Sequence, residues 1–199
     1  MDNGTKTSYL TIGAKAEGLY KDKGSRFLAF AEPVCTEDEA KQRLAFYRKT
    51  YHDARHVCFA YRVSGLLNPT LVWSTTERSS DDGEPSGTAG KPIMGRIESA
   101  GLDNILIVVV RYFGGILLGT GGLVVAYREA AQDALAHAQI TECDITVNRT
   151  LHFNYEQMHE VMRLIKDTDT RILRQDWNGS DCEMEVRIKV RHMEQFENL

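Results

Sequence analysis

An apolar run, NILIVVV at residues 104–110, constrains the fold of this 199-residue chain more than any other stretch. Nearly all of its residues are branched aliphatics, which is typical of a β-strand buried on both faces. A glycine-rich segment and then a helical pattern follow, in RYFGGILLGTGGLVVAYREAA at residues 111–131. The apolar spacing after the glycines predicts a long helix that packs against a sheet. Its inward face comprises Leu123, Ala126, Tyr127, Ala130, Ala134, Leu135 and Ala138.

The sequence before this run shows further strand and helix patterns. Predicted strands cover 25–34 and, joined through SGLLNP, 56–63 and 70–76. Thr36 and Glu39 have the spacing of a capping box, which predicts a helix that begins after Thr36. A short helix is expected with Pro92 near its start and Gly101 just past its end, because proline favours the first turn and glycine the position after the last.

From residue 141 onward the pattern is that of a second, smaller domain. Strands are predicted at 145–153 and 171–177, with a helix at 156–167 between them. Asn178-Gly179 is typical of a hairpin turn into a final strand at 183–190. This β-α-β-β order resembles a shortened ferredoxin-like unit. We therefore expect an α+β protein with domains at 1–140 and 141–199. The residues expected to face the core are Met158, Val161, Met162 and Ile165 on the helix. On the last strand they are Met184, Val186, Ile188 and Val190.

The charge distribution argues against tight nonspecific binding of nucleic acid. The formal net charge is −4, and residues 1–140 carry 16 acidic and 16 basic residues. The whole negative excess lies after residue 140, whereas proteins that grip a phosphate backbone usually show a basic excess. A local basic face remains compatible with this composition.

The four cysteines are distant from one another in sequence, and none forms a CxxC pair. The start of the chain has no signal-peptide pattern, and no apolar run is long enough to cross a bilayer. We therefore expect a cytoplasmic protein with reduced thiols and no membrane partner. The sequence leaves the oligomeric state open.

The glycine-rich turn has two interpretations. The glycines either allow a tight strand-to-helix connection or leave bare amides at a helix start, where a phosphate or carboxylate can bind. The spacing matches neither a P-loop nor a dinucleotide fingerprint. Arg111, with Tyr112 and Phe113 beside it, favours an anion or a stacked base near the end of the strand. The glycines assigned to this site are Gly114, Gly115, Gly119 and Gly121.

The polar loop at 77–91 is the second candidate. Its acids, Asp81, Asp82 and Glu84, could gather a cation or act in acid–base chemistry, but EF-hand spacing is absent. The loop also carries a second possible anion cradle ahead of a helix start. If the sheet brings this loop beside the glycine turn, the two would share one surface. The remaining loop residues assigned to the site are Gly83, Ser86, Gly87, Thr88 and Lys91.

Two other chemistries fit the residues less well. Ser86 in DGEPSG is reminiscent of the serine loop of Lon-type proteases, but no independent lysine partner is evident, since none follows Lys91 until Lys166. His52 and His56 are four apart, yet the predicted helix ends before His56, which argues against a zinc pair. We expect no metal and no cofactor, and we favour a role without catalysis.

Four segments resemble the YigZ/Impact family, and together they span most of residues 20–135. They are KGSRFLA at 23–29, HVCFAYR at 56–62, DDGEPSGTAGKPI at 81–93 and VVVRYFGGILLGTGGLVVAYREAA at 108–131. The resemblance implies a first domain similar to domain four of elongation factor G, of βαβ type, and a second, ferredoxin-like domain. Eukaryotic relatives in the family modulate a translation-repressing kinase and carry an extra RWD domain, for which we expect no counterpart in this chain. The bacterial-type layout is therefore expected.

These observations lead to two hypotheses. The first is a non-enzymatic, translation-linked regulatory protein that binds RNA or a ribosome-associated protein through a glycine-rich, anion-binding surface. The alternative is a hydrolase or phosphate-handling enzyme that uses the 81–91 loop with Ser86. A shared fold alone does not decide between them.

Overall fold

The computed structural model describes residues 6–67 and 72–197. The chain forms two compact units, one of residues 10–142 and one that combines residues 1–9 with 143–199. The expected boundary after residue 140 lies inside strand β7 (Ile140–Asp144). Strand β7 pairs with β1 (Ser8–Ile12) in a separate two-stranded sheet.

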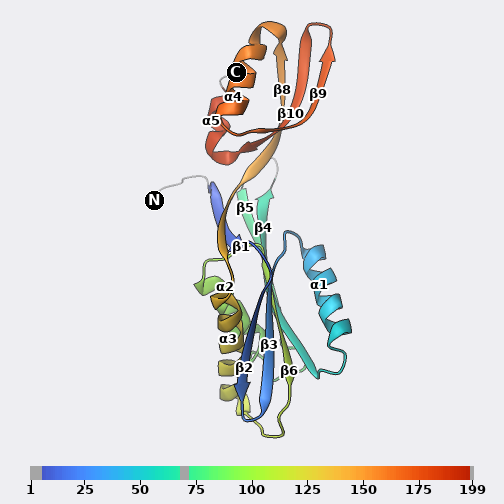
Figure 1. Ribbon diagram of the computed structural model, residues 1–199, viewed down its shortest axis with the longest axis vertical. Coiled ribbons are helices and arrows are strands. Elements are labelled where there is room, and N and C mark those ends of the chain that lie inside the picture. The colour runs from blue at the N-terminus through green and yellow to red at the C-terminus, as the bar shows by residue number, and fades with distance from the viewer. Residues whose placement is uncertain (1–5, 68–71, 198–199) are drawn as a thin grey trace. The chain divides into compact units, whose positions relative to one another are not determined.

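The larger unit is built on a five-stranded antiparallel sheet with the order β2-β3-β6-β4-β5 (Figure 1). Because β3 and β4 both pair antiparallel with β6, they run parallel to each other on either side of it. Helix α1 connects them, which gives a βαβ unit split by a central strand. The strands are β2 (Ala16–Asp22), β3 (Ser25–Pro33), β4 (His56–Leu67), β5 (Val72–Ser80) and β6 (Ile105–Tyr112).

The apolar run forms β6, and the expectation that it is buried on both faces is confirmed. Residues 105–110 are fully buried. Alternate residues along a strand point to opposite faces. Ile105, Ile107 and Val109 accordingly join one core, and Leu106, Val108 and Val110 join another.

Helices cover both faces of this sheet (Figure 1). Helix α1 (Glu37–Thr50) packs on one face through Ala40, Leu44 and Tyr47. Helices α2 (Gly90–Ser99) and α3 (Gly119–Ala136) pack on the other. The predicted inward face of α3 is buried from Leu123 to Leu135, and Ala138, beyond the end of the helix, is partly buried against the same core.

The ends of the helices follow from local chemistry. The Thr36 hydroxyl accepts a hydrogen bond from the Glu39 amide, as the capping box predicts. The Glu39 carboxylate, however, accepts from the amide of Cys35 and not from that of Thr36. Helix α2 begins two residues before Pro92, and Gly101 follows its end with a φ of 64°. A positive φ suits glycine because it has no Cβ to clash.

Three strands were not predicted, and two extend four residues beyond their predicted ends: β4 to Leu67, and β5 to Ser80, so that residues 77–80 of the predicted 77–91 loop are strand. Strands β1, β2 and β7 are short or polar, so their apolar alternation is weak. Strand β4 continues through the first four residues of SGLLNP to Leu67. The rest of that connection, and the first two residues of the strand expected at 70–76, lie outside the described residues.

The smaller unit confirms the β-α-β-β order, with a three-stranded antiparallel sheet ordered β8-β10-β9. Gly179, in the turn between β9 and β10, has a φ of 69°. The four residues predicted to face inward on the last strand are all buried. Of the four residues predicted to face inward on the helix between the first two strands, Met162 is exposed. The elements are β8 (Thr146–Asn154), a 3-10 turn (Tyr155–Gln157), α4 (Met158–Asp167), β9 (Arg171–Asn178), β10 (Asp181–Lys189), a second 3-10 turn (Val190–His192) and α5 (Met193–Phe196).

Candidate functional site

A pocket of about 380 Å³ in the larger unit brings together the two segments that the sequence singled out. Glu84 and Pro85 line it from the polar loop, and Arg111 and Phe113 line it from the end of β6. The start of α3 completes the wall, with His56 and Arg55 from the start of β4 and the turn before it. The lining residues at the start of α3 are Leu117, Leu118, Gly119, Thr120 and Leu123.

Glu84 and Arg111 form a buried ion pair in the wall of this pocket. Arg111 Nη1 donates to Glu84 Oε1 at 2.6 Å, and the hydroxyl of Tyr127 on α3 donates to the same oxygen at 2.7 Å. The guanidinium lies near the rings of Phe27 and Phe113. Its Nε is buried, and within residues 6–67 and 72–197 it has no hydrogen-bond partner. An unmet buried donor costs about 1–3 kcal/mol.

The side chain of Asp81 occupies the amides that the sequence suggested as an anion cradle. Asp81 Oδ1 accepts from the amides of Ala89 and Gly90 at 2.9 and 2.8 Å, and Oδ2 accepts from Gly87 at 2.8 Å. Burial raises the pKa of Asp81, but these amide hydrogen bonds outweigh it and hold the pKa below its usual value. The start of α2 therefore carries its own internal anion.

Asp82 joins the same loop to β4 and α1 by hydrogen bonds. Its carboxylate accepts from the Val57 amide at 2.7 Å and from Arg48 at 3.1 Å. His56 Nδ1 lies 2.8 Å from the Asp82 carbonyl oxygen. Asp82 and Gly83 both have positive φ, at 43° and 85°, which gives the loop a tight turn at this point. These two residues thus hold the loop in place beside β4.

Ser86 is exposed, and its side chain has no hydrogen-bond partner, basic or otherwise, within the described part of the chain. The nearby Thr88 is buried and donates its hydroxyl to the Pro85 carbonyl at 2.6 Å. Lys91 is exposed at the second residue of α2.

Tyr112 lies away from the pocket. It follows Arg111 on β6 and so faces the opposite side of the sheet, where it packs against the α1 core. Its hydroxyl donates to Asp53 at 2.8 Å, and Arg26 lies over its ring. Of the two aromatic residues predicted to accompany Arg111, only Phe113 lines the pocket.

The glycines of the turn have three different environments. A Cβ on Gly114 would lie 2.0 Å from the carbonyl carbon of Gly24, so close packing requires glycine there. Gly115 and Gly119 have φ values of 91° and 72°, which glycine adopts without strain. Gly121 has neither constraint, because its φ is not in the positive region and a Cβ there would have no atom within 4 Å. A glycine inside a helix costs about 1 kcal/mol relative to alanine.

The loop between β6 and α3 exposes three large apolar side chains. The exposed fractions are 51% for Phe113, 56% for Ile116 and 82% for Leu117. The sequence reasoning singled out Phe113 but missed the other two, although ILL directly follows Gly115. A cluster of exposed apolar residues on one loop is a usual mark of an interaction site.

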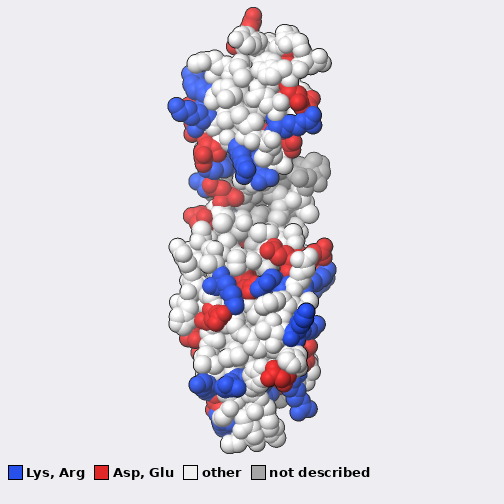
Figure 2. All heavy atoms as spheres, turned by 45° about the vertical axis from the view of Figure 1, so that its right-hand side comes forward, with Lys and Arg blue, Asp and Glu red and all other residues white. Residues whose placement is uncertain are grey.

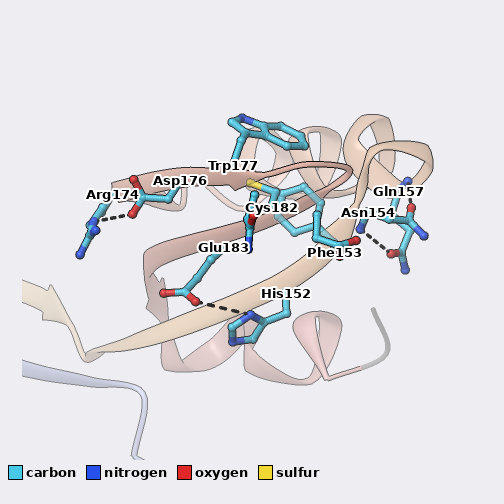
Figure 3. Close-up of a pocket in the computed structure, with 11 residues that line it drawn as sticks. His152, Phe153, Asn154, Gln157, Arg174, Asp176, Trp177, Cys182 and Glu183 are labelled. Atoms are coloured by element: carbon cyan, nitrogen blue, oxygen red, sulfur yellow. Dashed lines mark hydrogen bonds and ion pairs between the residues drawn. The ribbon is translucent and has the colours of Figure 1, made fainter.

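The smaller unit has a broader hollow of about 700 Å³ at one end of its sheet (Figure 3). Its charged residues largely pair with one another, Arg174 with Asp176 and His152 with Glu183. Figure 3 shows the Trp177 ring turned away from the His152–Glu183 pair. No motif in the sequence pointed to this hollow. Because these charged side chains are paired with one another, they do not indicate a particular ligand or reaction.

Figure 2 shows Lys and Arg interspersed with Asp and Glu on the face that it presents, without one extended basic area. Among the described residues, no three His, Cys, Asp or Glu side chains are grouped to hold a metal ion. None of the helices in this part of the chain has the length and hydrophobicity that a membrane span requires.

Known proteins resemble this chain over most of its length. The model of the Impact N-terminal domain matches residues 23–135. The IMPACT family member YigZ of Escherichia coli (strain K12) is 36% identical over 172 residues, which are 86% of this chain and 82% of that protein. An IMPACT family member of Haemophilus influenzae is 38% identical over 79% of this chain and 74% of its own. A crystal structure of a hypothetical protein superposes with a TM-score of 0.69 at 31% identity, covering 97% of this chain and 91% of that one. This chain therefore belongs to the Impact family.

Proposed function

We propose that this protein is a non-enzymatic regulatory protein linked to translation, which docks on a ribosome-associated protein through the β6–α3 loop. The observation that carries the proposal is the exposure of Phe113, Ile116 and Leu117 on one short loop. Burying such side chains against a partner removes apolar surface from water and so favours association. The link to translation comes from the family resemblance.

A protein partner fits the charge distribution better than RNA does. Binding to a phosphate backbone depends on Lys and Arg side chains that are free to replace its counterions. The guanidinium of Arg111 is engaged by Glu84, and Arg48 is paired with Asp82. The net charge of −4 adds no long-range attraction to RNA. The exposed apolar loop therefore supplies the main driving force in this proposal.

Ribosome co-sedimentation tests the proposal. The purified full chain should pellet with ribosomes that retain their associated proteins, and high-salt washing that strips those proteins should abolish the association. Ile116→Ser and Leu117→Ser should each weaken pelleting without lowering the Tm, because both side chains are exposed. Val72→Ser is the matched control, since Val72 is an exposed apolar residue on β5.

The alternative outcomes are distinct. Pelleting that persists on stripped ribosomes and falls steeply with salt would identify RNA as the partner and overturn the docking proposal. Equal pelleting of the loop variants and the wild-type protein would exclude the loop as the contact surface. A complete absence of association at low salt would overturn the link to the ribosome.

A further inference from the structure

We infer that the pocket of about 380 Å³ beside the β6–α3 loop receives an aromatic side chain of the partner protein, one that carries a hydrogen-bond donor and has an acidic residue next to it in sequence. Tryptophan and tyrosine combine an apolar ring with such a donor. This inference rests on the proposed docking of the loop and adds the chemistry of the segment that docks.

The walls of the pocket are mostly apolar. The apolar residues that line it are Phe113, Leu117, Leu118, Leu123 and Pro85. Phe113 and Leu117 are also exposed on the docking loop, so the loop and the pocket form one continuous surface. A cavity of about 150 Å³ is enough to hold benzene, so this hollow can take one large ring. Side chains that fill a pocket within an interface supply much of its binding energy.

His56 contributes one hydrogen-bond acceptor to this apolar lining. Its Nδ1 lies 2.8 Å from the Asp82 carbonyl oxygen, which can only accept, so Nδ1 carries the proton of the neutral ring. Nε2 is therefore left as an acceptor. It lies 3.9 Å from Glu84 Oε1, which is beyond hydrogen-bond distance and belongs to a carboxylate that also only accepts. A ligand can supply the donor that the protein does not.

The acceptor of His56 is open to the pocket. The residue lines the pocket with 14% of its side chain exposed. In the described part of the chain, Arg111 Nε is one of the polar atoms that are buried without a partner, and His56 Nε2 is not among them. An acceptor within apolar walls favours a ring that carries a donor over a hydrocarbon ring, because the hydrocarbon would leave the acceptor unmatched.

Arg55 determines which charge is complementary to the pocket. The residue is exposed, lines the pocket, and has no ion-pair partner within residues 6–67 and 72–197. The other guanidinium in the lining, that of Arg111, is neutralised by Glu84. The lining thus carries a net positive charge, to which an acidic residue beside the aromatic one is complementary.

A protein segment fits these features better than a nucleotide does. A nucleotide also joins a ring to an anion, but its sugar and phosphate would leave Ile116 and Leu117 uncovered. A polypeptide can cover these two side chains with apolar residues of its own while its aromatic residue occupies the pocket. A nucleotide is therefore one of the outcomes that the test separates.

The direct test is an NMR titration of the ¹⁵N-labelled full chain with two fragments. Indole carries the donor, and benzofuran has nearly the same shape without it. We expect indole to shift the amide signals of Phe113, Leu118 and Leu123. It should bind about three- to tenfold more tightly than benzofuran, because it alone can donate to His56. Absence of these shifts with indole, or equal binding of the two fragments, would overturn the inference.

The charge preference is tested with two acetylated dipeptide amides. The Asp-Trp dipeptide should bind about two- to fivefold more tightly than the Lys-Trp dipeptide, and Arg55→Gln should abolish this difference. Lys49→Gln is the matched control, since Lys49 is an exposed cation on α1 outside the lining. Equal binding of the two dipeptides would contradict the acidic neighbour. Tighter binding of adenosine monophosphate than of the Asp-Trp dipeptide would identify a nucleotide as the ligand and overturn the inference.

A larger side chain at Thr120 tests the pocket in the docking reaction itself. Thr120 is exposed and lines the pocket, so Thr120→Phe should obstruct it and weaken both indole binding and ribosome pelleting about tenfold. Val125→Phe is the matched control, because Val125 is an exposed β-branched residue of α3 outside the lining. It should leave both measurements unchanged.

The failure of this inference is distinguishable from that of the docking proposal. Normal pelleting of Thr120→Phe, together with loss of pelleting in Ile116→Ser, would overturn the inference and leave the docking proposal standing, since Ile116 lies outside the pocket lining. If the wild-type protein binds indole as expected but does not pellet with ribosomes, the link to the ribosome fails. The preference of the pocket would then apply to a different protein partner.

Discussion

Arg111 Nη1 lies 2.6 Å from Glu84 Oε1, which joins the end of the central strand to the loop after β5 across 27 positions of sequence. Register places Arg111 between Phe27 on β3 and His56 on β4. The Glu84 oxygen also accepts from the Tyr127 hydroxyl, so three elements of the unit meet at one carboxylate. This carboxylate therefore organises the pocket wall.

Removing the carboxylate should destabilise the protein strongly. Glu84→Ala leaves the Arg111 guanidinium buried without its counterion, and breaking a buried pair in this way costs about 3–5 kcal/mol. Urea unfolding followed by circular dichroism measures the loss. The double variant Glu84→Ala/Arg111→Met should be less destabilised than the sum of its two single variants, because they share one interaction. Strict additivity would show that the pair contributes no coupling energy.

Asp81 should make stability depend on pH in the acid range. Its pKa is lowered in the folded state. The stabilisation is therefore fully present above the unfolded-state pKa of about 3.9 and is lost as the pH falls through the lower folded value. Asp81→Asn should lower the free energy of unfolding by about 1–2 kcal/mol at pH 7. The difference from wild type should shrink below about pH 4.

Thermal or urea unfolding of both proteins between pH 2 and 7 checks this dependence. Asp167→Asn, at an exposed position at the end of α4, serves as the control and should change the free energy of unfolding at pH 7 less than Asp81→Asn does. A constant gap between wild type and Asp81→Asn across the whole range would mean that the charge of Asp81 does not stabilise the loop.

The two neighbouring glycines Gly114 and Gly115 should respond differently to alanine. Gly114→Ala forces a methyl group into the Gly24 backbone, and overpacking of this kind costs about 1–3 kcal/mol. Gly115→Ala meets no atom within 4 Å and carries only the cost of a positive φ, about 1 kcal/mol. Differential scanning calorimetry should give the lower Tm for Gly114→Ala. The reverse order would contradict the close packing against Gly24.

Cys58 should be unreactive in the folded protein. Burial raises the pKa of its thiol well above the usual value, and the side chain is enclosed between β4 and α3. Ellman's reagent at pH 8 should therefore modify exposed Cys35 at once and Cys58 only after unfolding in urea. Cys35→Ser should remove the fast phase, and Cys58→Ala should remove part of the slow one. Rapid modification of Cys58 in native buffer would show that the core around it opens.

Much of the fold could be predicted because its strongest patterns are local. The aliphatic run identified β6, and the Thr36–Glu39 spacing identified the start of α1, since burial and capping depend on a few neighbouring residues. The ion pair of Glu84 with Arg111 could not be predicted, although both residues were assigned to the site. The ion pair forms because the order and register of the strands bring the two residues together. The spacing of residues within one segment does not reveal that order or register.

Two features of the site differ from what the sequence suggested, for identifiable physical reasons. Tyr112 was grouped with Arg111 because they are adjacent in sequence, but adjacent strand residues face opposite sides. That alternation was available in the sequence and would have separated them. The sequence suggested the start of α2 as one possible anion cradle, and in the structure the Asp81 carboxylate accepts from the amides of Ala89 and Gly90 there. A carboxylate nine residues before the helix gives no periodic signal of such a contact.

The backbone contact between Gly24 and Gly114 links the β2–β3 hairpin to the loop that carries Ile116 and Leu117. Any rearrangement of that loop must either carry the hairpin with it or break the contact. Lys23 and Gly24, in the turn between β2 and β3, would then respond to a partner bound at the loop. A reporter group attached at the tip of the hairpin could follow binding without obstructing either the loop or the helix.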